Sequence, residues 1–250
     1  MSGRRAELAA SLAATRSRIS AACAAAGRDP AEITLIAVTK TYPASDVLAL
    51  ASLGVTDFGE NRDREAAPKA AEVSATIAAA APVTWHFIGQ LQTNKAHSVA
   101  GYARLVHSVD RVRLVRALGL AARAAGRDLT CLVQVSLDPA DADGTAAAGT
   151  RDAQARGGVP AAGLAEVGAA IEAEQGLTLG GLMAVAPRGL DPRRAFAPLR
   201  HLSDVIRSVN PSATLVSAGM SGDLEAAIES GATHLRIGTA LLGDRRPTVL

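Results

Sequence analysis

Short apolar runs alternate with amphipathic stretches along nearly the whole chain, and this alternation restricts the fold more than any other feature. Strand-like runs lie at 33–40, 55–60, 84–89, 104–109, 129–137, 179–186, 213–218 and 234–242. Helical stretches lie between them at about 44–53, 62–80, 92–100, 111–125, 161–175, 191–208 and 222–230, and a further helix over 4–26 comes first. Eight strand–helix units predict a parallel (β/α)8 barrel, with an open doubly wound sheet as the alternative. We predict one barrel domain over residues 1–250.

One segment interrupts this rhythm. Residues 138–160 are rich in Gly, Ala, Asp and Thr and show no apolar periodicity. Such a stretch inside a compact domain is typical of a long loop. We predict a flexible loop after the fifth strand, with a lid that a ligand orders as the alternative.

Composition excludes several classes of protein. The net charge is +2 and aromatic residues make up only 2% of the chain, so neither a basic stripe nor interleaved aromatic residues indicate nucleic-acid binding. No apolar run reaches the length of a membrane span, and the amino terminus does not resemble a signal segment. Cys23 and Cys131 lie far apart and suggest reduced thiols. We therefore expect a soluble, cytoplasmic protein that is a monomer, with no nucleic-acid or membrane partner.

A lysine ends the first strand at Lys40. Only three of the 26 basic residues are lysines, namely Lys40, Lys69 and Lys95, and the others are all arginines. A chain that uses arginine for almost every surface charge has little reason to place lysine there, unless the site needs a primary amine. A desolvated lysine can form a Schiff base with an aldehyde or ketone. The alternative is a lysine whose stem covers apolar surface while its amine reaches water.

The ends of the last two strands predict a site for a phosphate group. In barrels of this type the loops after the seventh and eighth strands often hold phosphate with backbone N–H groups. Here these loops carry hydroxyl side chains, glycines and an intervening methionine: Ser217, Gly219, Met220, Ser221, Gly222, Gly238 and Thr239. Ser221 could instead cap the following helix, with Asp223 and Glu225 in its first turn. Both roles are compatible.

Arg236 adds a third element to the predicted site. Period-two alternation places it on one face of the eighth strand, opposite Leu235 and Ile237, so it should point into the barrel. A buried guanidinium needs a partner, either an internal carboxylate such as Glu60 or Asp223, or a ligand atom. A lysine amine, a phosphate cradle and an inward arginine together suit pyridoxal 5′-phosphate (PLP).

The order of several motifs resembles the pyridoxal phosphate homeostasis protein family, the single-domain relatives of the alanine racemase barrel, known as fold type III among PLP proteins. The matching stretches are 33–40, 58–61, 85–89, 91–95, 107–110, 181–183, 217–223 and 236–239. The resemblance implies that Lys40 is the Schiff-base lysine and that Arg236 lies beside the pyridine nitrogen. It also implies that Ser217, Ser221, Gly238 and Thr239 contact the phosphate. The ring would be lined by Asn61, His86 and Met183.

The chain departs from the family pattern at two places. Ala218 stands where the family usually has methionine, a change that leaves the backbone donors in place. The fifth strand reads Gln134-Val135-Ser136, and Arg156-Gly157-Gly158 follows the long insertion, where the family usually has Gln-x-Asn and then Lys-x-Gly. The departures leave the predicted cofactor site unchanged and leave the fifth loop without an assigned role.

The predicted chemistry is binding rather than turnover. An arginine beside the pyridine nitrogen keeps that nitrogen unprotonated and makes the ring a weaker electron sink. Racemisation also needs a second acid or base, which the alanine racemase family takes from a further domain; the chain ends eleven residues after Thr239, so we expect no such domain here. Its tyrosines are Tyr42 and Tyr102, and Tyr42 could approach the site.

We therefore predict a protein of intracellular PLP homeostasis that binds the cofactor as a Schiff base, buffers it and hands it to apo-enzymes, without robust catalysis. The first alternative is a weak racemase-type enzyme. A Schiff-base aldolase acting on a phosphosugar would also use a barrel lysine, but on a later strand. A metal hydrolase is disfavoured because the five histidines lack ligand spacing.

Overall fold

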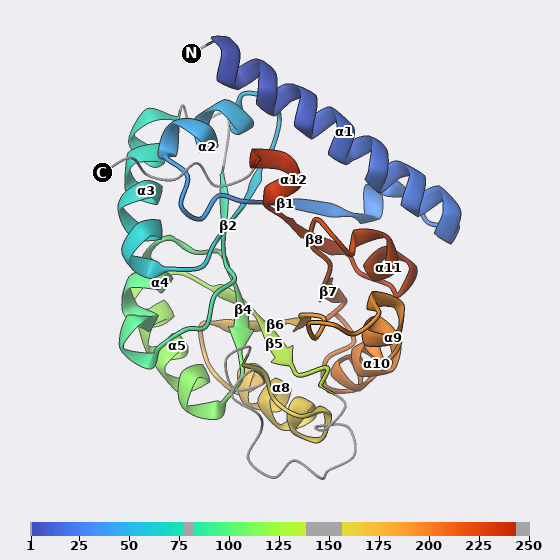
Figure 1. Cartoon of the computed structure of the whole chain (residues 1–250). Coiled ribbons are helices and arrows are strands. Elements are labelled where there is room, and N and C mark those ends of the chain that lie inside the picture. The colour runs from blue at the N-terminus through green and yellow to red at the C-terminus, as the bar shows by residue number, and fades with distance from the viewer. Residues whose placement is uncertain (1, 78–82, 139–156, 244–250) are drawn as a thin grey trace.

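Eight parallel strands close into a barrel in sequence order, as the sequence predicts (Figure 1). The computed structural model describes residues 2–77, 83–138 and 157–243. The strands are β1 (Thr34–Val38), β2 (Asp57–Glu60), β3 (Thr84–Phe87), β4 (Leu105–Val109), β5 (Leu129–Val135), β6 (Leu177–Ala184), β7 (Leu215–Ser217) and β8 (His234–Ile237). Pairing of β1 with β8 closes the ring, with Ile36 opposite Arg236. The alternative of an open sheet is thus wrong.

Helices surround this barrel (Figure 1). They are α1 (Ser2–Ala26), α2 (Ala44–Ala51), α3 (Asp63–Thr76), α4 (Ala96–Tyr102), α5 (Val112–Ala125), α8 (Leu164–Glu172), α9 (Pro192–Phe196), α10 (Leu199–Val209), α11 (Leu224–Glu229) and α12 (Thr239–Leu242). The long α1 packs beside α2, α11 and α12 on the outside of the barrel. Within the described residues, none of the helices has the length and apolar character that crossing a bilayer requires.

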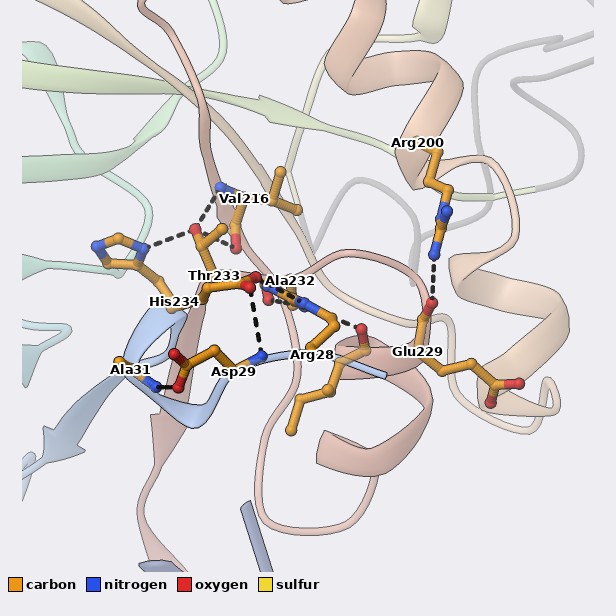
Figure 2. A network of polar contacts seen from close by, with 11 residues as sticks. Arg28, Asp29, Ala31, Arg200, Val216, Glu229, Ala232, Thr233 and His234 are labelled. Carbon is orange, nitrogen blue, oxygen red and sulfur yellow. Dashed lines mark hydrogen bonds and ion pairs between the residues drawn. The ribbon is translucent and has the colours of Figure 1, made fainter. Parts of the chain in front are cut away.

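Arg28 joins the chain that follows α1 to the barrel. Its Nη1 donates hydrogen bonds to the carbonyls of Ile228 (3.0 Å) and Ala232 (2.6 Å), which lie at the carboxyl end of α11 and just before β8. Figure 2 shows this guanidinium beside the residues that lead into β8. Arg28 therefore ties the chain after α1 to the segment between α11 and β8 through two main-chain carbonyls.

The main apolar core lies between the strands and the helices. Leu235 and Ile237 of β8 are fully buried in it, whereas Arg236, between them, makes its contacts on the other face of the strand. The alternation predicted for β8 is therefore confirmed. Strand β8 thus presents apolar side chains to the outer layer and a polar side chain, which needs hydrogen-bond partners, to the barrel interior.

Most predicted elements differ from the structure by a few residues at their ends, and two differ in kind or in number. The predicted strand over 234–242 is wrong after Ile237, because the chain turns at Gly238 and Leu241 and Leu242 donate back to its carbonyl to form α12. The predicted helix over 191–208 is divided into α9 and α10. Pro198 lies at the division and begins the second helix, since proline lacks an N–H and cannot continue the first.

The predicted loop over 138–160 is described only at its two ends, and 139–156 lie outside the described residues. At the returning end, Val159 pairs with β5: its N–H donates to Gln134 and its carbonyl accepts from Ser136, both at 2.8 Å. Gly157 and Gly158 have positive φ. The end of the segment is therefore joined to the carboxyl end of β5, on the side of the barrel where the candidate site lies.

Gly181 provides a test of the close approach between β6 and β7. Its φ is 150°, and a Cβ added there would lie 1.9 Å from the carbonyl oxygen of Leu215. Because the obstacle is backbone, Gly181→Ala should lower the free energy of unfolding by at least ~2 kcal/mol. The control is Gly101→Ala in α4, where a Cβ meets nothing within 4 Å; it should be neutral or stabilising. Urea unfolding measures both, and equal effects would contradict this account.

Candidate functional site

Lys40 lies in a tight turn directly after β1. The N–H of Tyr42 donates to the carbonyl of Thr39 at 3.0 Å, which closes a four-residue turn with Lys40 as its second residue. Thr41, the third residue, has φ 69°, the one positive φ at a non-glycine residue in the described chain. A β-branched residue is strained in this conformation. The half-buried Lys40 is therefore held by a backbone that local preferences disfavour.

Buried ionic contacts on the outer face of the sheet hold the start of this turn. The Thr39 hydroxyl donates to Glu60 Oε1 at 2.7 Å, and Lys69 Nζ donates to Glu60 Oε1 at 2.6 Å and to the Thr39 carbonyl at 2.8 Å. Burial raises the pKa of Glu60, while Lys69 and Thr39 act in the opposite direction. Lys69 thus stabilises the backbone at Thr39, the residue before Lys40.

The loops after β7 and β8 are joined to each other. The hydroxyl of Ser221 accepts a hydrogen bond from the N–H of Ala240 at 3.2 Å, and the carbonyl of Gly219 accepts from the N–H of Arg236 at 3.0 Å. Gly219 has φ 90°, and a Cβ there would lie 2.6 Å from the Cβ of Ala227. These contacts bring the predicted phosphate loops into one surface at the carboxyl end of the barrel.

Arg236 points into the barrel and is buried. Its Nη1 donates to Ser217 Oγ at 2.7 Å and its Nη2 donates to the carbonyl of Ala184 at 2.9 Å. Burial lowers the pKa of Arg236 to about 10, against the opposing charge of Asp223. Glu60, one of the carboxylates considered as its partner, bonds to Lys69 on the outer face of the sheet instead, so that alternative is wrong.

A run of polar side chains continues from Arg236 through the barrel interior. Ser217 Oγ lies 2.9 Å from His107 Nδ1, His107 Nε2 lies 2.9 Å from His86 Nδ1, and His86 Nε2 lies 2.9 Å from Asp57 Oδ1. Sequence reasoning assigned no role to Asp57 or His107. Alternation along β2 and β4 offered a signal, because both residues lie on the inward-facing period of their strands.

The remaining predicted residues lie around the same end of the barrel. Met183 on β6 is buried and pairs with Ser217 on β7. The backbone of Asn61, after β2, contacts the loop at Gly89 so closely that a Cβ there would lie 2.1 Å from the Asn61 carbonyl oxygen. Thr239 begins α12, and Met220 is 40% exposed. Their roles toward a cofactor stay predictions.

Other candidate groups have different surroundings. The hydroxyl of Tyr42 donates to the carbonyl of Gly243 at 2.7 Å, so this tyrosine already has a polar partner. Cys23 and Cys131 are buried and unpaired. In the parts of the chain that the structure describes, His, Cys, Asp and Glu form no group that could hold a metal ion.

Comparison with known proteins places the chain in a family. The model of the alanine racemase N-terminal domain matches residues 10–246. A protein of Mycobacterium tuberculosis, named pyridoxal phosphate homeostasis protein, is 43% identical over 254 residues, which cover 97% of this chain and 95% of that protein. The chain belongs to the pyridoxal phosphate homeostasis protein family. This confirms the resemblance drawn from the motifs.

Solved structures agree with this family assignment. An unknown protein from Bifidobacterium adolescentis superposes with a TM-score of 0.84 at 29% identity, covering 96% of each chain. PipY of Synechococcus elongatus, solved with PLP bound, superposes with a TM-score of 0.77 at 32% identity and covers 94% of this chain and 100% of its own. The barrel of this family therefore extends over nearly all of the chain.

The contacts of Lys69 predict that losing its charge destabilises the protein. Lys69→Met would leave the buried Glu60 carboxylate without its cation, at a cost of ~3–5 kcal/mol in the free energy of unfolding. The control is the double variant Glu60→Gln/Lys69→Met, in which neither charge remains and much of the stability should return. Urea unfolding measures both, and a double variant as unstable as Lys69→Met would refute the ion-pair account.

The interior histidines predict a loss of stability in acid. Burial lowers the pKa of His234 to about 4 and that of His107 well below its ordinary 6.5. Between pH 6.5 and 4 the unfolded chain binds protons that the folded chain does not, so stability falls as pH falls. His234 alone should contribute a loss of roughly 3 kcal/mol by pH 4. His234 lies beside Thr233 (Figure 2).

The control for this pH dependence is His234→Gln, which keeps a polar side chain that cannot titrate. Its free energy of unfolding should change less between pH 7 and pH 4 than that of the unmodified protein. Denaturant unfolding at a series of pH values measures the difference. The same slope in both proteins would contradict the depressed pKa of His234.

Proposed function

We propose that the chain binds pyridoxal 5′-phosphate through Lys40 and serves intracellular PLP homeostasis by buffering and delivering the cofactor. The observation that carries this proposal is the joint placement of Lys40 after β1 and the buried Arg236 on the adjacent β8, at the end of the barrel where the glycine-rich loops meet. The printed names of relatives support it: one is a pyridoxal phosphate homeostasis protein, and PipY was solved with PLP bound.

The residues at this end of the barrel fit the cofactor. PLP supplies an aldehyde that condenses with a primary amine, releasing water and forming a Schiff base. Lys40 offers that amine on a turn with a fixed backbone. The phosphate would bind at the joined loops, through the backbone of 219–221 and 238–239 and the hydroxyls of Ser221 and Thr239. Arg236 would face the pyridine nitrogen, with Asn61, His86 and Met183 around the ring.

Ser217 takes a different part from the one that the family resemblance implies. Its hydroxyl is buried between Arg236 and His107, which supports a role in holding Arg236. Direct contact of this hydroxyl with the phosphate stays a prediction.

The same geometry favours a carrier over an enzyme. Racemisation requires two proton-transfer groups fixed on opposite sides of the substrate. Lys40 supplies one, and the tyrosine nearest to it in sequence, Tyr42, has its hydroxyl bonded to Gly243. An imine that remains accessible would be open to hydrolysis by water or to exchange with an incoming amine, either of which would free the Lys40 amine and release the cofactor, so delivery to apo-enzymes follows from the proposal. The family model of the alanine racemase N-terminal domain keeps weak racemase activity as the second candidate.

Attachment to Lys40 gives the direct test. The purified protein, loaded with PLP and reduced with borohydride, should carry the adduct on the peptide that contains Lys40, and Lys40→Ala should abolish it. Lys95→Ala is the matched control, because the Lys95 side chain is 48% exposed and 4.0 Å from Asp63; it should label normally. An adduct on Lys95 or Lys69 in the unmodified protein would overturn the assignment.

The choice between carrier and enzyme needs a separate experiment. Loaded protein is mixed with an apo-enzyme that requires PLP, and separately with alanine, serine and other amino acids. We expect recovery of the apo-enzyme's activity and no steady turnover of any amino acid. Steady turnover that Lys40→Ala abolishes would identify an enzyme instead.

A further inference from the structure

The polar side chains inside the barrel form one continuous chain with a definite direction. Five residues from five strands take part: Asp57 on β2, His86 on β3, His107 on β4, Ser217 on β7 and Arg236 on β8. All but Asp57 are buried. Hydrogen-bond chemistry leaves little freedom in how such a chain is protonated, and the direction can be worked out from its two ends.

At the first end, a guanidinium can only donate. Arg236 Nη1 therefore donates to Ser217 Oγ, and the Ser217 hydroxyl is left with one proton to give. If it donates this proton to His107 Nδ1, 2.9 Å away, that nitrogen carries no proton of its own. Because burial lowers the pKa of His107 well below its ordinary value, this ring is neutral. His107 thus carries its proton on Nε2 and donates it to His86.

At the second end, an ionised carboxylate can only accept. His86 Nδ1 accepts from His107, so His86 carries its proton on Nε2 and donates to Asp57 Oδ1. Burial alone would raise the pKa of Asp57, but the hydrogen bonds from His86 and Thr56 outweigh it, and the pKa lies below its ordinary value. The carboxylate end requires this direction, the arginine end is compatible with it, and each bond in the chain then has one donor and one acceptor.

We infer that Asp57, His86, His107 and Ser217 are positioning residues that fix the Arg236 guanidinium for its ligand, with Asp57 as the terminal acceptor that sets the direction of the chain. The inference rests on the proposed function, because the ligand of Arg236 is the pyridine ring of PLP. With Nη1 bound to Ser217 and Nη2 bound to the Ala184 carbonyl, the plane of the guanidinium is determined. Loss of the terminal acceptor would allow the histidines to reverse their protons.

Asp57 also connects the chain to the opposite end of the barrel. As the first residue of β2 it lies at the amino end of the strands, its side chain is 20% exposed, and it lines an open groove of about 510 Å³ between α1 and the barrel. Thr56 donates to its other oxygen, Oδ2, at 2.6 Å. A substitution that removes the acceptor at this groove, across the barrel from Lys40, should therefore alter the orientation of the Arg236 guanidinium.

The first experiment observes the protons directly and needs no cofactor. In protein with 15N-labelled histidine at neutral pH, two-dimensional NMR of the imidazoles distinguishes a protonated from an unprotonated ring nitrogen. We expect the ring proton of His86 and that of His107 to lie on Nε2, with Nδ1 as the acceptor in each ring. A proton on Nδ1 of either ring overturns the inference, whether or not the protein binds PLP.

The second experiment removes the acceptor. In Asp57→Leu the side chain keeps its volume but accepts no hydrogen bond, so His86 should move its proton to Nδ1 and His107 should follow. The Kd for PLP should rise about tenfold, the equivalent of one lost hydrogen bond, while borohydride still fixes the cofactor on Lys40. Unchanged tautomers with an unchanged Kd overturn the inference.

Asp57→Asn is the conservative control. Its amide oxygen can accept from His86 while its amide nitrogen donates to the hydroxyl of Thr56, so both tautomers and the Kd should return to within about twofold of the unmodified protein. An Asn variant that behaves like Asp57→Leu refutes the role of the acceptor. Failure of the unmodified protein to bind PLP, with the Nε2–H tautomers present, would refute the proposed function and leave the chain of hydrogen bonds established.

Discussion

The burial of Arg236 is the constraint on which the interior of this barrel depends. A guanidinium taken out of water costs several kcal/mol unless hydrogen bonds replace its hydration. Here the replacements are a serine hydroxyl and a main-chain carbonyl, both of them neutral. The negative charge that acts on it is that of Asp223, and the chain of side chains that begins at Arg236 ends at a second carboxylate, Asp57. Polar side chains therefore enter the inner layer beside apolar ones such as Ile36 and Met183, because one cation must be accommodated there.

Strand β2 shows how two polar systems are kept apart. Alternation sends Asp57 inward and Glu60 outward, since Glu60 shares the face of the core residue Phe58. The inward carboxylate ends the chain that leads to Arg236, and the outward one joins Lys69 to the turn of Lys40. One short strand thus supports both halves of the candidate site, the amine and the guanidinium, without bringing the two carboxylates together.

The sequence predicted the features that are encoded locally. Eight strand–helix units are local patterns, so the barrel followed from them, and period-two alternation correctly oriented Arg236. The chain of polar side chains that begins at Arg236 could not be found this way, because Ser217, His107 and Asp57 come from strands far apart in sequence and meet only when the barrel closes. The end of β8 was mistaken for a similar reason. Leu241 and Leu242 suit a strand as well as a helix, and the backbone hydrogen bonds to Gly238 decide between them.

The strained turn at Thr41 bears on how this protein could be engineered. A search for stabilising substitutions would choose glycine at position 41 first, since it relieves a positive φ that is worth ~1–3 kcal/mol at a β-branched residue. The same substitution would widen the conformations open to the backbone of Lys40. A version of this protein stabilised in that way would hold the amine of Lys40 in a less defined position. Selection for stability alone would therefore favour glycine at position 41, whereas selection for a fixed Lys40 would keep threonine.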